Sequence, residues 1–174
     1  METVVIEQMS RIRKLKANLE KSLKVNLTFN KDNVEIESKN DDAYNEYLAV
    51  SVLEALDLGF DLNSALSLKN ENYMIEKIPI KNYVRPSRMK SVLGRVIGER
   101  GRTKQVISEM TGCAVSIKDY TISIIGDTED VSLARHAVQS LIRGAPHSNV
   151  YAYLERNRRL KRIKEEDIDL KEFK

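Results

Sequence analysis

The chain has 174 residues, of which 41% are hydrophobic and 32% are charged, so a core can form beneath an unusually ionic surface. No segment approaches the roughly 18 consecutive apolar residues that a membrane span needs, and the residues after Met1 lack the pattern of a secretory signal. One cysteine and two histidines are too few for a disulfide or a structural zinc site. We therefore expect a cytoplasmic protein without metal or cofactor.

Charge is distributed unevenly along the chain. Residues 1–76 contain nine Lys and Arg against 14 Asp and Glu, whereas residues 77–174 contain 20 against 12. A basic half favours a polyanionic partner, most often nucleic acid, because each neutralised phosphate releases counterions. A merely soluble, highly charged surface stays open as the alternative on charge alone.

The chain contains a weak internal repeat. Shifted by 88 residues, the pattern of residues 15–36 matches that of residues 103–124. Shifted by 85, the pattern of residues 49–68 matches that of residues 134–153. In each copy, helical spacing is followed by two segments of period two and a further helical segment, which predicts two domains of similar fold.

The elements that precede these patterns complete each domain. In the first domain, Thr3–Ile6 predicts a strand and Met9–Leu23 predicts one continuous helix. In the second, Tyr73–Ile80 predicts a strand and Met89–Val96 a short helix. We expect an α+β fold in which each domain has the order β-α-α-β-β-α and a three-stranded sheet covered by helices.

A glycine-rich segment separates two predicted helices of the second domain. Three of the seven glycines lie in residues 94–104, GRVIGERGRTK, with spacings that fit neither a Walker A loop nor a dinucleotide fingerprint. The segment Gly98-Glu99-Arg100-Gly101 instead forms a GxxG pattern. Glycines there permit a sharp turn and a close approach of a sugar-phosphate backbone, while the next helix presents free N–H groups to a phosphate.

This placement of GxxG is typical of a KH domain, whose loop clamps about four single-stranded nucleotides. An ordinary glycine-rich turn is the alternative. Aromatic residues make up only 6%, with no Trp, which argues against an RRM or OB-type stacking platform. Aliphatic side chains such as Val106 would line a KH groove, although most of them also suit the core. The RNA contacts that we predict here are Arg95, Ile97, Gly98, Glu99, Arg100, Gly101, Arg102, Lys104, Val115 and Ile117.

The first copy lacks these glycines. The offset of 88 places Ser10–Arg13 opposite GxxG, so we predict a degenerate domain that acts as a scaffold or a protein-binding surface. The fold class is therefore two tandem type I KH-like domains. Their expected bounds are 1–69 for the degenerate domain, 70–150 for the domain with GxxG, and 150–174 for a basic C-terminal helix and acidic tail.

The segment Val150–Lys164 predicts a positively charged helix over a partial apolar stripe. A second contact with the RNA backbone is one interpretation, and a solvated terminal helix is the other. The contacts predicted on this helix are Arg156, Arg158, Arg159 and Arg162. The carboxylates from Glu165 to Asp169 predict a solvated tail rather than a metal site.

Several motifs resemble those of a known family. Residues 94–104, the segment ISEMTG at 107–112 and the segment GAPHSNVY at 144–151 are similar to the two-KH ribosome-assembly factors called partner of Nob, in their short archaeal form. The resemblance implies an RNA-binding protein, not an enzyme, that binds the 3′ region of small-subunit rRNA and assists the endonuclease that trims this end. It also implies contact with the α subunit of translation initiation factor two.

Two other functions stay open at this point. The chain could bind other RNA, such as mRNA or the substrate of an RNA-degradation complex, through the same GxxG loop. It could also be a protein–protein adaptor linked to translation initiation, acting through its acidic first domain. Neither His136 nor His147 belongs to a recognisable nucleophile signature, which argues against hydrolase chemistry.

Overall fold

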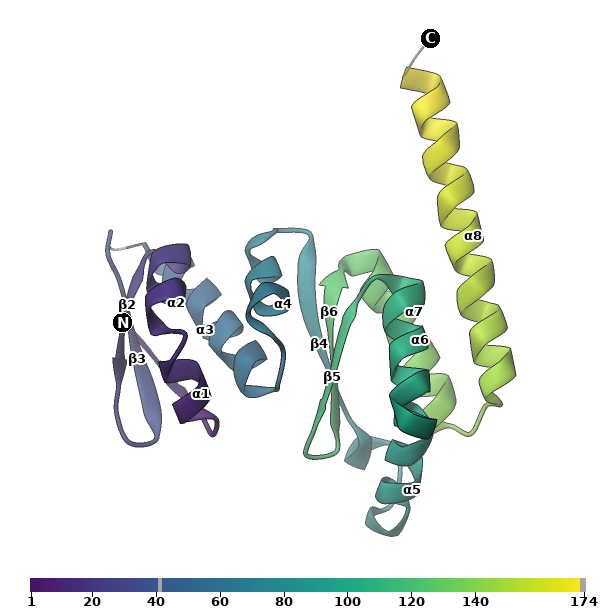
Figure 1. Cartoon of the computed structure of the whole chain (residues 1–174), viewed down its shortest axis with the longest axis horizontal. Coiled ribbons are helices and arrows are strands. Elements are labelled where there is room, and N and C mark those ends of the chain that lie inside the picture. The colour runs from purple at the N-terminus through teal and green to yellow at the C-terminus, as the bar shows by residue number, and fades with distance from the viewer. Residues whose placement is uncertain (41, 173–174) are drawn as a thin grey trace.

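A computed structural model describes residues 1–40 and 42–172, which form two antiparallel sheets with helices packed against them (Figure 1). The elements of the first half are β1 (Glu2–Val5), α1 (Met9–Arg13), α2 (Lys16–Leu23), β2 (Val25–Phe29), β3 (Asn33–Ser38), α3 (Ala43–Asp57), α4 (Leu62–Leu66) and the short 3-10 helix η1 (Ser67–Lys69). The elements of the second half are β4 (Tyr73–Pro79), η2 (Ile80–Asn82), α5 (Pro86–Ile97), η3 (Glu99–Gly101), α6 (Arg102–Thr111), β5 (Ala114–Lys118), β6 (Thr121–Asp127), α7 (Thr128–Ile142) and α8 (His147–Glu172).

The two sheets have the same topology. Their strand orders are β1-β3-β2 and β4-β6-β5, and every neighbouring pair is antiparallel. Val4 lies opposite Val34 in the first sheet, and Ile78 lies opposite Ile122 in the second. The predicted α+β class and the order β-α-α-β-β-α are therefore confirmed for both halves.

The ends of the longest helix in each half repeat in atomic detail. Asp42 caps α3 by accepting from the Tyr44 N–H at 3.0 Å, and Asp127, 85 residues later, caps α7 in the same way. Both helices end at a glycine with positive φ, 96° at Gly59 and 99° at Gly144. These positions favour glycine because a Cβ crowds the backbone there. The internal repeat is thus a property of the fold.

The continuous helix predicted over Met9–Leu23 is wrong, because the chain turns at residues 14–15 and forms two helices. Neither glycine nor proline marks the break, and Ile12 and Leu19 share one face in a straight helix. Long-range contacts impose the turn. The Arg11 guanidinium donates to the Phe60 carbonyl at 2.7 Å, which holds α1 at the end of α3 while α2 lies over the sheet.

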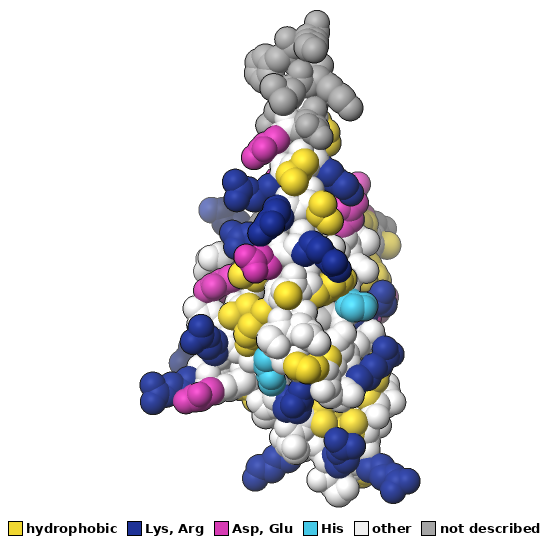
Figure 2. Space-filling view, turned by 90° about the vertical axis from the view of Figure 1, so that its right-hand side faces the viewer, with side chains coloured by type: hydrophobic (Ala, Val, Ile, Leu, Met, Phe, Trp, Pro, Cys, Tyr) yellow, Lys and Arg dark blue, Asp and Glu magenta, His cyan; other side chains and the backbone are white. Residues whose placement is uncertain are grey.

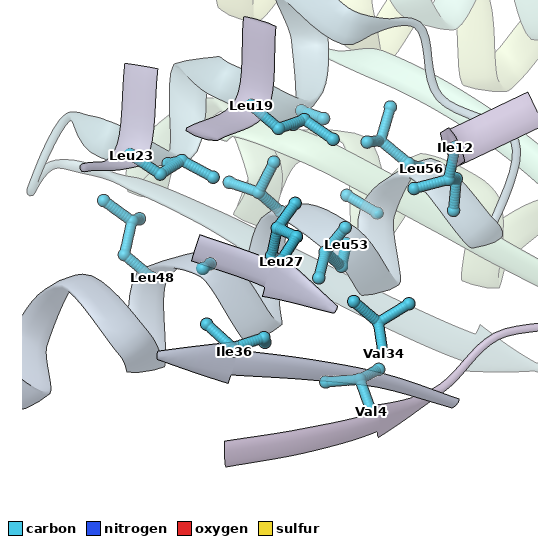
Figure 3. Packing of buried hydrophobic residues seen from close by; sticks show 14 of the residues in the cluster. Val4, Ile12, Leu19, Leu23, Leu27, Val34, Ile36, Leu48, Leu53 and Leu56 are labelled. Carbon is cyan, nitrogen blue, oxygen red and sulfur yellow. The ribbon is translucent and has the colours of Figure 1, made fainter. Parts of the chain in front are cut away.

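Each half has its own hydrophobic core, and the first half also covers the second sheet. Figure 3 shows the first core, in which Leu27 and Ile36 of the strands face Leu19 and Leu53 of the helices. In Figure 1, α3 and α4 lie between the two sheets. Residues of β6 alternate accordingly, since Ile124 belongs to the second core whereas Ile125 packs in the first.

The C-terminal helix α8 extends well beyond the rest of the molecule (Figure 1). Its first part packs through Val150 and Leu154 against the second core. It is longer than the predicted Val150–Lys164, and the stretch predicted as an acidic tail is helical as far as Glu172. Residues 173–174 of that predicted tail lie outside the described residues. Between Met1 and Glu172, no helix is long and apolar enough to cross a membrane.

Candidate nucleic-acid interface

The GxxG segment forms a tight turn between α5 and α6, as its spacing predicts. The Gly98 N–H donates to the Gly94 carbonyl at 2.9 Å, and the Gly101 N–H donates to the Gly98 carbonyl at 3.2 Å. Three residues have positive φ: Gly98 at 74°, Arg100 at 52° and Gly101 at 77°. A left-handed arginine costs on the order of 1 kcal/mol, and backbone strain of this kind concentrates at functional sites.

The two glycines of the turn have different roles. A Cβ on Gly98 would lie 2.7 Å from both the Cβ and the backbone nitrogen of Thr103. Thr103 is buried at the start of α6, where its hydroxyl lies 2.9 Å from that of Tyr151 on α8. A Cβ on Gly101 would meet no atom within 4 Å. Gly98 therefore permits the packing of α6 against α8, whereas Gly101 leaves open space beside the helix start.

That open space belongs to a groove between α6 and β5, which we call the α6–β5 groove. It has a volume of about 450 Å³. It is lined by Gly101, Lys104, Gln105, Ser108, Glu109 and Val115. The N terminus of α6 opens beside it, and no side chain caps this end. Its free N–H groups and positive dipole end favour a phosphate.

Most of the predicted contacts meet at this end of α6. The loop residues Glu99 and Arg100 are exposed, as is Arg102, and Lys104 lines the groove. Within the described part of the chain, no hydrogen bond or ion pair engages the side chains of Arg100, Arg102 and Lys104. These cationic groups are therefore available to a phosphate backbone, without an internal partner to displace.

The predicted aliphatic contacts are shared between groove and core. Val115 lines the groove with only 9% of its surface exposed. Ile97 is half-buried at the end of α5, immediately before the turn. Ile117 is also half-buried, but it packs against the second core. Val115 is the member of this set that the structure places in the groove wall.

Arg95 does not join the groove. Its guanidinium donates from Nη2 to the Ala145 carbonyl at 2.7 Å and from Nε to the Leu141 carbonyl at 3.5 Å. His147 Nε2 lies 2.9 Å from the Arg95 carbonyl oxygen. Arg95 thus joins α5 to the connection between α7 and α8, and its positive charge is used inside the fold.

Three predicted arginines of α8 line a second groove, the α6–α8 groove, of about 330 Å³. Its lining consists of Met110, Glu155, Arg158, Arg159 and Arg162. Arg156 is exposed but lies about a third of a turn away around α8. Figure 2 shows Lys and Arg side chains flanking the exposed part of α8 and gathering again at the opposite end of this face.

Helix α8 is held in place on its other side by an ion pair. Lys161 Nζ lies 2.8 Å from the Asp130 carboxylate of α7. The hydrogen bonds to Asp130 raise the pKa of Lys161, although partial burial opposes this shift. Lys161 therefore anchors α8, whereas the three arginines of the α6–α8 groove face away from this anchor.

Sequence reasoning missed a group of basic residues before the GxxG turn. They are exposed on η2 and the first part of α5 and comprise Lys81, Arg85, Arg88 and Lys90. A finer division of the charge would have found them. Residues 77–104 contain nine Lys and Arg and a single carboxylate, Glu99, whereas residues 105–174 contain 11 of each sign. The positive excess of the second half lies entirely in the segment that leads into α6.

The site offers binding groups rather than reactive ones. In residues 1–40 and 42–172, no group of three or more His, Cys, Asp or Glu is placed to hold a metal ion. Burial raises the pKa of the Cys113 thiol to about 11, so the thiol is neutral near pH 7. Cys113 packs closely against Gly126 and behaves as a core residue.

Comparisons with known proteins agree with this geometry. A family model described as a eukaryotic-type KH domain (KH domain type I) matches residues 74–159. A KH domain-containing protein of Methanocaldococcus jannaschii is 34% identical over 166 residues, which cover 89% of this chain and 73% of that protein. The pre-rRNA-processing protein PNO1 of Eremothecium gossypii is 34% identical over 105 residues, which cover 59% of this chain and 39% of that protein. The chain spans about half the length of two nematode relatives.

Among solved structures, a chain from the complex of a/eIF2alpha, aDim2p and rRNA of Pyrococcus horikoshii is similar to this protein. The TM-score is 0.80 at 33% identity, and the match covers 91% of this chain and 93% of that one. The KH architecture predicted from the GxxG segment is therefore confirmed, together with the family that the motifs resemble. The chain belongs to the partner-of-Nob family of KH-domain proteins, which includes the archaeal Dim2p proteins.

Proposed function

We propose that this protein binds single-stranded rRNA in the α6–β5 groove and acts in the assembly of the small ribosomal subunit. The observation that carries the proposal is the open, left-handed Gly101 beside the uncapped N terminus of α6. A phosphate can approach the main chain there because no Cβ stands in the way. The names of the relatives support rRNA as the ligand, since one is a pre-rRNA-processing protein and another was solved with rRNA.

The groove suggests how a strand would lie. Arg100, Arg102 and Lys104 would pair with phosphates at the start of α6, while a base would rest against Val115. The arginines of the α6–α8 groove would add phosphate contacts farther along the RNA. This division assigns affinity to charge and the close backbone approach, and discrimination between bases to the groove wall.

The finer role rests on the family resemblance. We propose that the RNA is the 3′ region of small-subunit rRNA and that the bound protein assists the endonuclease that trims this end. The protein would act by holding RNA, without catalysing the cleavage itself. The α subunit of translation initiation factor two is a further proposed partner, supported by the complex in which the Pyrococcus relative was solved.

Ultraviolet crosslinking in cells that express the tagged chain tests this proposal. We expect crosslinks concentrated near the 3′ end of small-subunit rRNA, with their protein side in residues 98–104. Crosslinks scattered over mRNA would instead support a KH protein with other targets. Absence of RNA crosslinks, with retained protein partners, would support the adaptor function and contradict the proposal.

A matched variant makes the crosslinking result specific. The double substitution Glu99→Asp and Arg100→Asp keeps both glycines and lowers the charge of the loop by two. Asp is among the residues that tolerate a left-handed backbone, so the turn can still form. We expect the rRNA crosslinks to disappear in this variant while its expression and solubility stay unchanged.

A further inference from the structure

Strand β5 has two faces that serve different halves of the molecule. Val115 lines the α6–β5 groove, whereas its neighbours Ala114 and Ser116 face the first half. The Ser116 hydroxyl donates to the Leu58 carbonyl, at the end of α3, at 2.7 Å. Because side chains alternate along a strand, the residue that would touch RNA lies between two residues fixed to the other half.

Lys118 ties the same strand to the first half more strongly. Its Nζ lies 2.7 Å from Glu7 Oε2, 3.2 Å from Asp57 Oδ2 and 3.0 Å from the Asp57 carbonyl oxygen. Partial burial lowers the pKa of Lys118, but the hydrogen bonds and charges of Glu7 and Asp57 together outweigh it and raise the pKa. The ammonium group is thus a charged link between β5, the end of α3 and the segment before α1.

The acceptor of this link is itself fixed. Asp57 Oδ1 also accepts the backbone N–H groups of Glu7 at 2.9 Å and Gln8 at 2.8 Å, at the start of α1. Beside it, Gly59 approaches β5 so closely that an added Cβ would lie 3.0 Å from the Ser116 hydroxyl oxygen. The contact between the halves is therefore tight at the strand that forms the groove wall.

Strand β5 needs this support because of its place in the sheet. It lies at an edge and pairs with β6 alone. An edge strand is held by backbone hydrogen bonds on one side only, so its position depends on what packs against its faces. On the face away from the groove, that packing comes from the first half, through Ala114 and the core that contains Ile125.

We propose that the first half holds β5 in the position that RNA binding requires, with Ser116 and Lys118 as positioning residues. The inference rests on the proposed function, because it concerns the affinity of the α6–β5 groove for RNA. The half without a GxxG loop then contributes to RNA binding without touching RNA. Couplings of this kind typically change a binding constant by about 2- to 30-fold.

The test uses the full chain with Ser116→Ala and Lys118→Met combined, and a short single-stranded RNA from the 3′ end of small-subunit rRNA. We expect binding to weaken by about 10-fold, within the range for such couplings. The salt dependence should not change, because the phosphate contacts remain. Titration at saturating RNA should show a fully active protein, whereas a merely structural role would lower the active fraction and leave the dissociation constant of the folded protein unchanged.

Two further variants protect the result from trivial explanations. Lys118→Arg keeps the charge and should bind within about twofold of wild type, below the range of these couplings. Lys77→Met breaks another ion pair between the halves, with Glu54 at 2.7 Å, but lies on β4, at the other edge of the sheet from the groove. It should bind RNA as wild type does. If the combined variant fails to fold, Ser116→Ala alone, which removes no charge, takes its place.

Wild-type affinity in the Ser116→Ala, Lys118→Met variant would overturn the inference, and so would an equal loss in Lys77→Met. The loop variant with Glu99→Asp and Arg100→Asp, measured beside them, separates this failure from that of the proposed function. If the loop variant binds as tightly as wild type, the groove is not the RNA site. If only the loop variant loses affinity, the groove stands and the positioning role of the first half is wrong.

Discussion

Arg11 in the first half and Arg95 in the second occupy the same place in the fold. Arg11 donates to the carbonyls of Leu56 and Phe60, and Arg95 donates to those of Leu141 and Ala145, each 85 residues further on. The two arginines themselves are 84 residues apart, whereas the helices after the turn repeat at 88. Four residues of the second half, 99–102, therefore have no counterpart in the first.

This correspondence corrects the alignment of the two copies. The offset of 88 sets Ser10–Arg13 opposite the GxxG residues, but Arg11 belongs opposite Arg95, and the turn at residues 14–15 belongs opposite the whole loop. The first half has not replaced its glycines with other residues. It has the same pair of helices joined by a shorter turn.

Two other additions distinguish the second half. The first strands repeat at an offset of 74, since Val4 opposite Val34 matches Ile78 opposite Ile122, so ten more residues precede the arginine of the second half. At the other end, α4 has five residues, whereas its counterpart α8 has 26. The shared frame is present in both halves, and the second half is the same frame with three extensions.

The positive charge follows these extensions. The first contains the basic group of η2 and α5, the second contains Arg100 and Arg102, and the third contains the arginines of the α6–α8 groove. The difference teaches that the KH frame by itself does not make an RNA-binding surface. Loop, helix extension and charge were combined on one copy, while the other copy became its support.

Removing the loop residues should make the second half resemble the first. We expect deletion of residues 99–102 to weaken RNA binding by about 30- to 1,000-fold, because the charge-assisted contacts of the loop are worth on the order of 2–4 kcal/mol. Circular dichroism should show the helices retained, since the first half folds with the shorter turn. Tight RNA binding by the folded deletion variant would contradict the comparison.

The two glycines of the turn should respond differently to alanine. Gly98→Ala should lower the free energy of unfolding by about 2–4 kcal/mol, because strain at positive φ adds to a collision with Thr103. Gly101→Ala should cost only the strain, about 1–2 kcal/mol, and should weaken RNA binding because its Cβ enters the groove. Urea denaturation and RNA titration of both variants measure this contrast. Equal stability losses would disprove the division of roles.

How far the sequence predicts this site is clear from particular residues. Periodicity predicts the strands and the repeat because half-buried strands alternate, and the glycine spacing predicts the turn because positive φ favours glycine. The break at residues 14–15 and the internal role of Arg95 depend on carbonyls about 50 residues away, which no local pattern reveals. The support of β5 by Asp57 is of the same kind.

The paired arginines provide a test of the shared frame. Arg11→Ala and Arg95→Ala should each lower the free energy of unfolding by about 1–3 kcal/mol, because each leaves partly buried carbonyls without a donor. Neither should change the salt dependence of RNA binding. A salt slope reduced by about 0.7 in Arg95→Ala would show that Arg95 contacts a phosphate after all.

The arginines of the α6–α8 groove should contribute a smaller, general effect. Replacing Arg158, Arg159 and Arg162 with Ala should flatten the log–log salt slope by about 2, at about 0.7 for each contact, and weaken all RNAs alike. The matched control replaces three exposed lysines of the first half, Lys14, Lys21 and Lys31, and should leave the slope as it is. An unchanged slope in the arginine variant would show that this part of α8 is merely solvated.

The most direct measurement compares RNA affinity and thermal stability in the variant with Glu99→Asp and Arg100→Asp. The control is Lys31→Asp, an exposed change in the first half that also lowers the charge by two. We expect the loop variant to lose about 30- to 1,000-fold in affinity for RNA from the 3′ end of small-subunit rRNA. Its unfolding free energy should move by no more than about 0.5 kcal/mol, and the control should bind as wild type does. A folded loop variant with wild-type affinity would contradict the assignment of RNA binding to this turn.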